Sequence, residues 1–325
     1  MKTKRIAAII ISGLMISALV FLPGRATAEY PEKAVTVIAP HPAGGDTDQV
    51  ARAITAAARQ DFPKGIAVVN RAGGGGTIGI GEVVRARPDG YTLASAPIAP
   101  LVVGPQRVQT PYKTANDYQP IIRMVKSAYS IAVQKDKPWK NFEELLAYSK
   151  ANPGKVRMGM AGEGTISHLA VTRLLRLAKV DMTVIPFTGG AQSVTALLGG
   201  HIDVNSQATS EIIAHVQAGN VRLLASMDDK RSPSFPDLPT LKEIGFDVTS
   251  IIDHSIMGPK GLSPAVVSWL HETFKRAMND PVFRKTMEQR YYTIAYEGPE
   301  DLKKRLLQAY ETYGKILEDL GLGKK

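Results

Sequence analysis

Residues 34–52 read AVTVIAPHPAGGDTDQVAR, and this stretch contains the local signals that decide the fold. Its β-branched start, Ala34–Ala39, predicts a buried strand. The pair Gly44 and Gly45 predicts a tight turn, because glycine accepts backbone conformations that other residues avoid. Thr47–Gln60 then predicts a helix with one apolar face. A strand, a glycine loop and a helix in this order indicate the first unit of an α/β protein.

The same order of strand and helix continues along the chain. Further strands are predicted at Ile66–Asn70, Thr92–Ala96, Ser130–Gln134, Val156–Met160, Thr183–Pro186, Ile202–Ser206 and Val221–Ser226. Helices are predicted at Ile78–Arg87, Phe142–Ala151, Ser167–Leu177, Ala191–Leu198, Glu211–Ala218, Pro264–Asn279, Pro281–Gln289 and Pro299–Leu320. This alternation predicts mainly parallel sheets with right-handed crossovers.

The length of the chain predicts two lobes. The sequence has 325 residues, and single hydrophobic cores stop growing at ~250–300 residues. No flexible linker stands out, although a turn-rich stretch, Ser232–Pro239, follows the second series of strands. We therefore expect the chain to cross between the lobes more than once, as in hinged ligand-binding proteins.

Residues 1–28 are typical of a secretory signal peptide. Basic residues at the start precede an apolar run, Ile6–Leu22, and Ala26-Thr27-Ala28 offers a small-residue cleavage site. The apolar run is at the short end of the ~17–25 residues that span a bilayer, so an uncleaved anchor is the alternative. The Ala-x-Ala site favours cleavage after Ala28, and we expect export to the periplasm.

Composition removes several classes of function. There is no cysteine, which excludes disulfides, a thiol nucleophile and cysteine metal sites. The net charge is +10, but the basic residues are scattered rather than clustered with aromatic residues, so nucleic acid is not an expected partner. The sequence has no G-x-S-x-G, H-E-x-x-H or Walker motif, and its histidines lack metal-ligand spacing. We expect no catalytic residue, no metal and no cofactor.

Four glycine-rich loops each follow a predicted strand and open a predicted helix. They are residues 42–48, 73–77, 162–168 and 188–192. Glycine lets backbone N–H groups approach a ligand, and a helix N-terminus adds partial positive charge, so such loops favour an anion. Any one glycine could merely permit a tight turn. Four such loops, two in each predicted lobe, favour a shared ligand cleft at the carboxyl ends of the strands.

Two features near these loops need separate interpretation. Gly74-x-Gly76-x-x-Gly79 matches the dinucleotide fingerprint, but the acid expected ~20 residues further on is missing. Asp48 is most simply the N-cap of the first helix. Asp46 fits an anion site less well, because its carboxylate would repel the ligand. It therefore faces outward, binds a cationic group on the ligand, or argues against an anion site.

Ordered motifs run along almost the whole chain after the signal peptide. The first are Tyr30-Pro31-x-Lys33, Pro40-x-x-Ala43-Gly44-Gly45-x-x-Asp48-x-x-Ala51-Arg52, Val69-Asn70-Arg71-x-Gly73-x-Gly75-Gly76-x-Ile78-Gly79 and Pro88-Asp89-Gly90-Tyr91-Thr92-Leu93. The later ones are Asn152-Pro153-Gly154-Lys155, Gly162-x-Gly164-Thr165-x-x-His168-Leu169, Pro186-Phe187-x-Gly189-Gly190 and Gly199-Gly200-x-Ile202-Asp203. This series resembles the Bug family, the periplasmic receptors of tripartite tricarboxylate transporters.

The resemblance implies a two-lobed "Venus flytrap" that closes on a small organic carboxylate. Residues 29–128 with 253–325 are expected to form one lobe, and residues 129–252 the other. Carried across from the family, the cleft is lined by Ala43, Gly44, Ser95, Ala96, Thr165, His168, Gly189 and Asp203. The predicted ligand-binding set also includes His41, Asp48, Gly162 and His254. Permease subunits of the transporter are the implied membrane partner, and a monomer is expected.

This chain departs from the family pattern at three places. His41 stands where the family has an aromatic residue, Asp46 replaces a small residue, and Asp253-His254-Ser255 replaces a usual tryptophan. All three departures are expected near the mouth or hinge of the cleft. They bear on which ligand is bound more than on the fold.

Three functions are compatible with such a cleft. The leading hypothesis is a solute receptor that delivers a carboxylate to a permease. A second keeps the flytrap but gives it a signalling partner. The third is an exported enzyme acting on a carboxylate, which requires a nucleophile or an acid–base pair that no motif in the sequence indicates.

Overall fold

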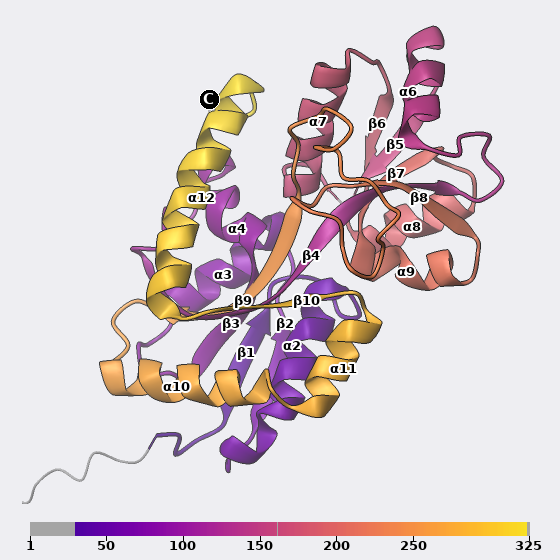
Figure 1. Ribbon diagram of the computed structural model, residues 1–325. Helices are drawn as coiled ribbons and strands as arrows, with labels where there is room; N and C mark the ends of the chain where they lie inside the picture. Colours follow the sequence, from indigo (N-terminus) through magenta and orange to yellow (C-terminus); the bar gives the residue numbers. More distant parts are fainter. Residues whose placement is uncertain (1–29, 161, 324–325) are drawn as a thin grey trace, which may run out of the picture.

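The computed structural model describes residues 30–160 and 162–323. The signal peptide predicted at residues 1–28 lies outside the described residues. Figure 1 shows two lobes, each a sheet flanked by helices, joined by long strands that run from one to the other. The expected two-lobed α/β fold is confirmed. None of the described helices is both long and apolar enough to span a membrane.

The sheet of the first lobe is parallel at one edge and antiparallel at the other. In order across the sheet its strands are β2 (Ile66–Asn70), β1 (Val35–Ala39), β3 (Thr92–Pro97), β9 (Ile251–Pro259), β4 (Tyr118–Gln134) and β10 (Thr293–Glu297). β1 pairs in parallel with β2 and β3, as the strand–helix alternation predicted. β9, β4 and β10 pair in antiparallel fashion.

The sheet of the second lobe repeats this plan. In order its strands are β6 (Thr183–Pro186), β5 (Arg157–Met160), β7 (Val204–Ala208), β4 and β8 (Val221–Ser226). β5 is parallel to β6 and β7, while β4 is antiparallel to its neighbours.

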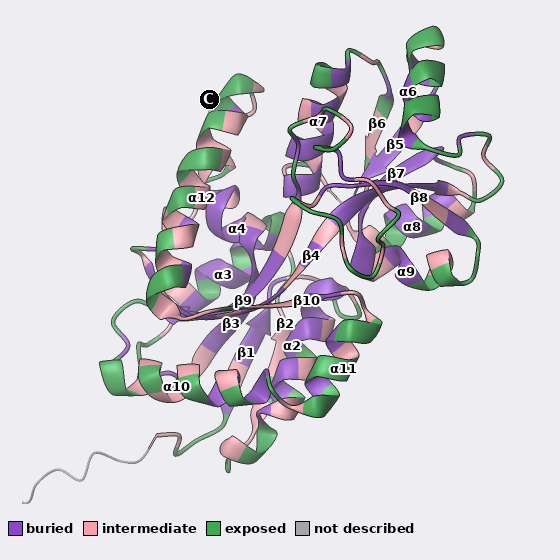
Figure 2. Cartoon of the chain, in the orientation of Figure 1, coloured by how far each residue is buried: buried purple, intermediate pink, exposed green. Residues whose placement is uncertain are grey.

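Helices cover both faces of each sheet. In the first lobe α2 (Asp46–Ala57), α10 (Pro264–Ala277) and α11 (Pro281–Gln289) pack on one face, and α3 (Thr77–Val84), α4 (Ile98–Val102) and α12 (Pro299–Asp319) on the other. In the second lobe α8 (Gly190–Leu198) and α9 (Thr209–Gln217) oppose α6 (Phe142–Ala151) and α7 (Ile166–Ala178). Figure 2 shows the result: the central strands are buried, the edge strands are partly exposed, and the outer helix faces are exposed.

The strand β4 belongs to both lobes. It pairs with β9 as far as Ala128 and with β7 from Tyr129 onward. The chain therefore passes between the lobes inside a hydrogen-bonded strand, and β9 provides the return path. A connection of this kind holds the lobes in register better than a loop would.

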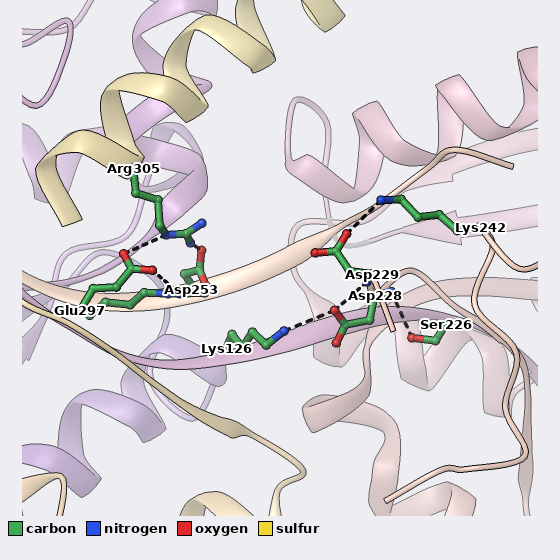
Figure 3. Close-up of polar contacts among 9 residues, drawn as sticks. Lys126, Ser226, Asp228, Asp229, Lys242, Asp253, Glu297 and Arg305 are labelled. Atoms are coloured by element: carbon green, nitrogen blue, oxygen red, sulfur yellow. Dashed lines mark hydrogen bonds and ion pairs between the residues drawn. The ribbon is translucent and has the colours of Figure 1, made fainter. Parts of the chain in front are cut away.

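Charged side chains bind the crossing strands together (Figure 3). Arg123 of β4 pairs with Asp253 of β9 and with Glu297 of β10. Arg305 of α12 pairs with the same two acids. Burial, followed by the charge of Arg123, lowers the pKa of Arg305 to about 10. The four residues thus form an alternating network of charges beside the hinge.

Five elements were not predicted from the sequence: β9, β10, α4, the short helix α5 (Gly104–Arg107) and the first half of β4. Pro120 interrupts the apolar pattern of β4, and proline is unusual within a central strand. β9 carries Asp253, His254 and Ser255, all of them buried. Buried polar residues break the alternation of apolar and polar residues that identifies a strand. The crossing strands β9 and the first half of β4 therefore show no two-residue hydrophobic period in the sequence.

Candidate functional site

The glycine loops lie at the carboxyl edges of the parallel strands in both lobes. In the first lobe they follow β1 and β2, and in the second they follow β5 and β6. The start of α9, after β7, lies at the same edge of the second lobe. The two edges meet, since Ser210 Oγ of α9 donates to Asp46 Oδ1 of α2 over 3.0 Å.

Asp48 holds the first glycine loop from within. Its Oδ2 accepts the Gly44 N–H at 2.9 Å and lies 3.0 Å from Arg52 Nε, while Oδ1 accepts Asn70 Nδ2 at 2.9 Å. Burial alone would raise the pKa of Asp48, but these hydrogen bonds hold it below its usual range. The N-cap of α2 is Gly45. The predicted N-cap role is therefore wrong, and the Asp48 carboxylate fixes the loop instead of facing a ligand.

Asp46 points inward, into a buried polar cluster. Its Oδ2 lies 2.8 Å from His254 Nε2, and its Oδ1 accepts hydrogen bonds from Ser210 and from the Tyr292 hydroxyl. Asp46 is only 7% exposed. Burial would raise the pKa of Asp46, but the hydrogen bonds and the charge of His254 lower it, so the group is ionised. An outward-facing Asp46 is thus excluded.

Glu211 faces the same cluster from the second lobe. Its carboxyl accepts a hydrogen bond from the Gln207 side-chain amide. It lies over Gly190, where an added Cβ would stand 1.9 Å from Glu211 Oε2. Burial, followed by the negative charge of Asp46, raises the pKa of Glu211 to about 8. The Glu211 carboxyl is therefore largely protonated at neutral pH.

His41 lies beside this cluster. Its Nδ1 is 3.1 Å from Thr47 Oγ1. Burial, followed by the neighbouring His254, lowers the pKa of His41 to about 4, which leaves the ring neutral at pH 7. The three departures from the family pattern, represented by His41, Asp46 and His254, are therefore neighbours in space.

The loop of residues 162–168 is held by its own side chains. Thr165 is the N-cap of α7; its Oγ1 accepts the His168 N–H at 3.3 Å and donates to the Gly162 carbonyl at 2.9 Å. His168 Nδ1 accepts the Gly164 N–H at 3.0 Å. Burial, followed by the charge of Arg107, lowers the pKa of His168. Both side chains shape the loop, and the Thr165 hydroxyl proton is already used.

Arg107 reaches this loop from the first lobe. An added Cβ on Gly164 would stand 1.4 Å from Arg107 Nη1, and Arg107 Nη2 lies 3.6 Å from Glu163 Oε1. The buried Nε of Arg107 has no hydrogen-bond acceptor within the described ranges 30–160 and 162–323. A guanidinium at the start of α7 is a suitable partner for a carboxylate. Arg107 was not predicted from the sequence, because a single arginine outside any motif carries no signal.

The other predicted site residues lie along the same two edges. Ser95 and Ala96 are fully buried in β3, and Ser95 Oγ has no partner in the part of the chain that the structure describes. The register of β3 against β9 places Ser95 and His254 on one face of the sheet. Ala43 is exposed in the first loop, and Gly189 is the N-cap of α8.

Asp203 does not belong to the site. It precedes β7, at the amino edge of the sheet, and its carboxylate pairs with Arg157 Nε at 2.9 Å and with Lys137 Nζ at 2.7 Å. Burial would raise the pKa of Asp203, but the hydrogen bonds from Arg157 and Lys137 hold it well below its usual range. The prediction was wrong because a motif gives the position of a residue in the chain and not the edge of the sheet that it faces.

A cavity of about 450 Å³ opens between the lobes beside Asp46. The first lobe lines it with Gly44, Gly45, Asp46, Gln49, Thr286, Gln289 and Arg290, and the second with Ala191, Ser210, Glu211, Ile213, Ala214 and Gln217. Its volume is in the range of small-molecule sites, ~300–1,000 Å³.

Three residues of the second lobe at this site were not predicted from the sequence either: Gln207, Ser210 and Glu211. A signal for them exists, since they occupy a strand-to-helix junction after β7, the same topological place as the glycine loops. They lack the glycines that marked the other junctions. Tyr292 enters from just before β10 and carries no such signal.

The chain matches a family model over residues 50–322, and that model is described as the tripartite tricarboxylate transporter family receptor. A Cupriavidus necator protein, named UPF0065 protein in the gbd 5′ region, is 31% identical over 94% of this chain and 93% of its own. The solved structure of the periplasmic binding protein BugD has 32% identity and a TM-score of 0.83, covering 91% of this chain and 100% of BugD.

MatC from Rhodopseudomonas palustris, solved with bound malate, has 25% identity and a TM-score of 0.80 over 89% of this chain and 100% of its own. These similarities extend over nearly the whole chain and concern solute-binding receptors, not enzymes. This chain belongs to the tripartite tricarboxylate transporter receptor family, the Bug-type periplasmic solute-binding proteins.

Proposed function

We propose that this chain is an extracytoplasmic receptor that captures a small organic carboxylate between its lobes and delivers it to the membrane permease of a tripartite tricarboxylate transporter. The observation that carries the proposal is that the carboxyl edges of the two lobes meet at Asp46 and Ser210, beside an interlobe cavity lined mainly by the first glycine loop, α9 and α11. Ligands of open α/β sheets bind at this carboxyl edge. Membership of the receptor family and the malate bound to MatC support a carboxylate.

The proposed ligand contacts come from both lobes. They are His41, Ala43, Gly44, Ser95, Ala96 and His254 in the first lobe, and Gly162, Thr165, His168 and Gly189 in the second. To these we add Arg107, whose guanidinium lies against Gly164, just before the start of α7. Helix N-termini at α2, α7 and α8 add partial positive charge at the same edge.

The proposal includes a division of the chain into lobes. Residues 29–128 with 253–325 form one lobe and residues 129–252 the other, which agrees with the change of β4 partners between Ala128 and Tyr129. Cleavage after Ala28 and a monomeric state complete the proposal. A ligand that touches both lobes binds the closed arrangement better than the open one, so binding is coupled to closure.

A thermal-shift screen of residues 29–325 against mono-, di- and tricarboxylates and amino acids tests the proposal, with calorimetry on each hit. The protein is first unfolded and refolded to remove any ligand acquired during expression. A ligand at 100 times its Kd adds ~2.7 kcal/mol of stability. One clear carboxylate hit with one-to-one stoichiometry supports the proposal, and a flat response from well-folded protein contradicts it.

A further inference from the structure

The lobes contact each other through a largely buried group of polar side chains, part of which belongs to each lobe. Asp46 and its partners His254 and Tyr292 belong to the first lobe. Ser210 and Glu211 belong to the second lobe and line the interlobe cavity together with Asp46. Ser210 Oγ donates to Asp46 Oδ1 over 3.0 Å, so the two parts of the group touch in this arrangement. A movement that opens the cleft separates Glu211 from Asp46 and brings water between them.

Glu211 has no paired cation in this arrangement. Asp46 forms an ion pair with His254, whereas Glu211 forms none within the described ranges 30–160 and 162–323. Arg290 lines the same cavity, but it pairs with neither carboxyl in the described part of the chain. Two like charges repel each other more strongly where water is excluded. An ionised Glu211 beside Asp46 is therefore unfavourable while the lobes are together.

The hydrogen-bond partner of Glu211 also favours a protonated carboxyl. Gln207 is fully buried, and its side-chain N–H donates to Glu211. The Oε1 atom of Gln207 is buried and has no donor among the residues that the structure describes. A protonated carboxyl has a hydroxyl that can donate to this oxygen, whereas a carboxylate can only accept. Protonation of Glu211 thus lets both ends of the Gln207 amide form hydrogen bonds, as buried polar groups usually do.

We propose that Glu211 makes closure of the cleft depend on a proton: the lobes come together when its carboxyl is protonated and separate more readily when it is ionised. The effect on ligand affinity rests on the proposed function, whereas the movement of the lobes requires no ligand. Burial, followed by the negative charge of Asp46, raises the pKa of Glu211 to about 8 in the arrangement described. An open cleft removes both causes, so the pKa there approaches the ordinary 4.5.

The direction of the pH dependence follows from this difference between the two arrangements. Because the pKa of Glu211 is higher when the lobes are together, closure takes up a proton between about pH 4.5 and pH 8. The ratio of closed to open protein therefore falls by up to about tenfold per pH unit as the pH rises through this window, and it levels off above it. A ligand that requires the closed arrangement loses affinity in the same direction.

Other titratable groups lie around Glu211. They are Asp46 on α2, Tyr129 on β4, His254 on β9, Tyr292 before β10, Arg290 after α11 and His215 one turn further along α9. The elements β7 and α8, which also pack against α9, carry no titratable residue. Burial raises the pKa of Tyr129 and of Tyr292, so neither titrates near neutral pH. Imidazole groups do titrate there, so the experiment has to distinguish Glu211 from His254 and His215.

A distance measurement between the lobes tests the inference in the ligand-free protein. The chain has no cysteine, so Asn220→Cys after α9 and Lys285→Cys on α11 attach one spin label to an exposed position on each lobe. Pulsed dipolar electron spin resonance then measures the distribution of distances between the labels. We expect the shorter distances to give way to longer ones as the pH rises from ~5.5 to ~9. A distribution that is the same at every pH, or that shortens as the pH rises, overturns the inference.

The Glu211→Gln variant identifies the titrating group. Glutamine keeps the volume of the carboxyl and can donate to Gln207 Oε1 as the protonated acid does, so the variant is expected to fold. It cannot ionise, and we expect the short distances at every pH. Glu143→Gln, the same substitution on the exposed face of α6, is the matched control and keeps the pH dependence. A pH dependence that survives in Glu211→Gln overturns the assignment and points to His254 or His215.

Calorimetry extends the test to ligand binding, with a carboxylate from the thermal-shift screen whose own groups do not titrate near neutral pH. Titrations in buffers of different ionisation enthalpy count the protons exchanged on binding. We expect uptake of up to about one proton at pH ~7 in the unmodified protein and none in Glu211→Gln. Binding without proton uptake overturns the inference and leaves the proposed function intact. If no carboxylate binds, the proposed function fails, and the distances in the ligand-free protein still decide the inference.

Discussion

Thr165 makes two hydrogen bonds at the start of α7, one to the His168 N–H and one to the Gly162 carbonyl. Valine in place of Thr165 keeps the shape of the side chain and removes both. We expect a loss of ~1 kcal/mol of stability, which is typical of a lost N-cap, and weaker ligand binding because the loop is no longer fixed. Thr165→Ser retains both hydrogen bonds and is the control. Denaturation and calorimetry measure the two effects. Unchanged affinity in Thr165→Val removes this loop from the proposed site.

Asp203 also stabilises the fold through its side chain, but it lies at the edge of the sheet opposite to Thr165. Asp203→Asn leaves Arg157 and Lys137 without their carboxylate, which costs ~1–3 kcal/mol of stability. Because the pKa of Asp203 is depressed, this contribution is present at neutral pH and disappears as the pH falls through the acid range. Urea unfolding at neutral and acid pH measures it. Ligand affinity is expected to stay unchanged, and a weaker affinity at full folding would return Asp203 to the site.

The contribution of Glu211 to stability depends on pH in the opposite direction to that of Asp203. Its pKa is raised from 4.5 to about 8, so the folded protein keeps a proton that the unfolded chain releases. The free energy of unfolding therefore falls as the pH rises through this window and levels off above it. Glu211→Gln removes that part of the slope. Denaturation of both proteins across this pH window is the measurement, and identical slopes would show that the Glu211 carboxyl is not protonated in the folded state.

At the scale of elements, Gly79 explains why the dinucleotide fingerprint occurs without a nucleotide. An added Cβ would stand 2.7 Å from the Arg71 carbonyl oxygen and 3.0 Å from Pro40 Cα. The helix α3 thus packs against the ends of β1 and β2 at a distance that only glycine permits. Gly79→Ala is expected to cost ~1–3 kcal/mol by overpacking, measured by denaturation. Gly189→Ala, where an added Cβ meets no atom within 4 Å, is the control for stability. Equal stability of the two variants would contradict this packing.

Elements with a clear period were predictable from the sequence. The helices Phe142–Ala151 and Pro281–Gln289 and the strand Thr183–Pro186 have the predicted bounds. β9 was not predictable, because its polar residues are paired with groups distant in the sequence. Asp253 pairs with Arg123 and Arg305, and His254 contacts Asp46. A pattern of neighbouring residues in the sequence gives no information about partners that are this distant along the chain.

The site was predictable only in outline. The glycine loops and their position at the carboxyl edges followed from the motifs and the α/β alternation. The direction of each side chain did not, since Asp48 and Thr165 turn toward their own loops and Asp203 lies at the other edge. Glu211 comes from a junction without glycine and Arg107 from the end of the short helix α5, and neither was predicted. Which side chains meet across the lobes depends on the tertiary fold.

At the scale of the whole molecule, several contacts join the lobes around the cleft. Asp46 meets Ser210 on one side, and Arg107 meets Glu163 on another. β4 and β9 pass between the lobes as paired strands, and the charged network of Arg123, Asp253, Glu297 and Arg305 lies beside them. A hinge of this construction permits closure by small changes of backbone angle while each lobe remains rigid.

Small-angle X-ray scattering of residues 29–325, with and without a saturating carboxylate identified by the thermal-shift screen, tests the central claim that the ligand is held between the lobes. A ligand that touches both lobes stabilises the closed arrangement, so we predict a smaller radius of gyration and a shorter maximum dimension when it is bound. Scattering curves that superimpose at saturation would contradict the account, because a ligand that leaves the lobe arrangement unchanged does not bridge them.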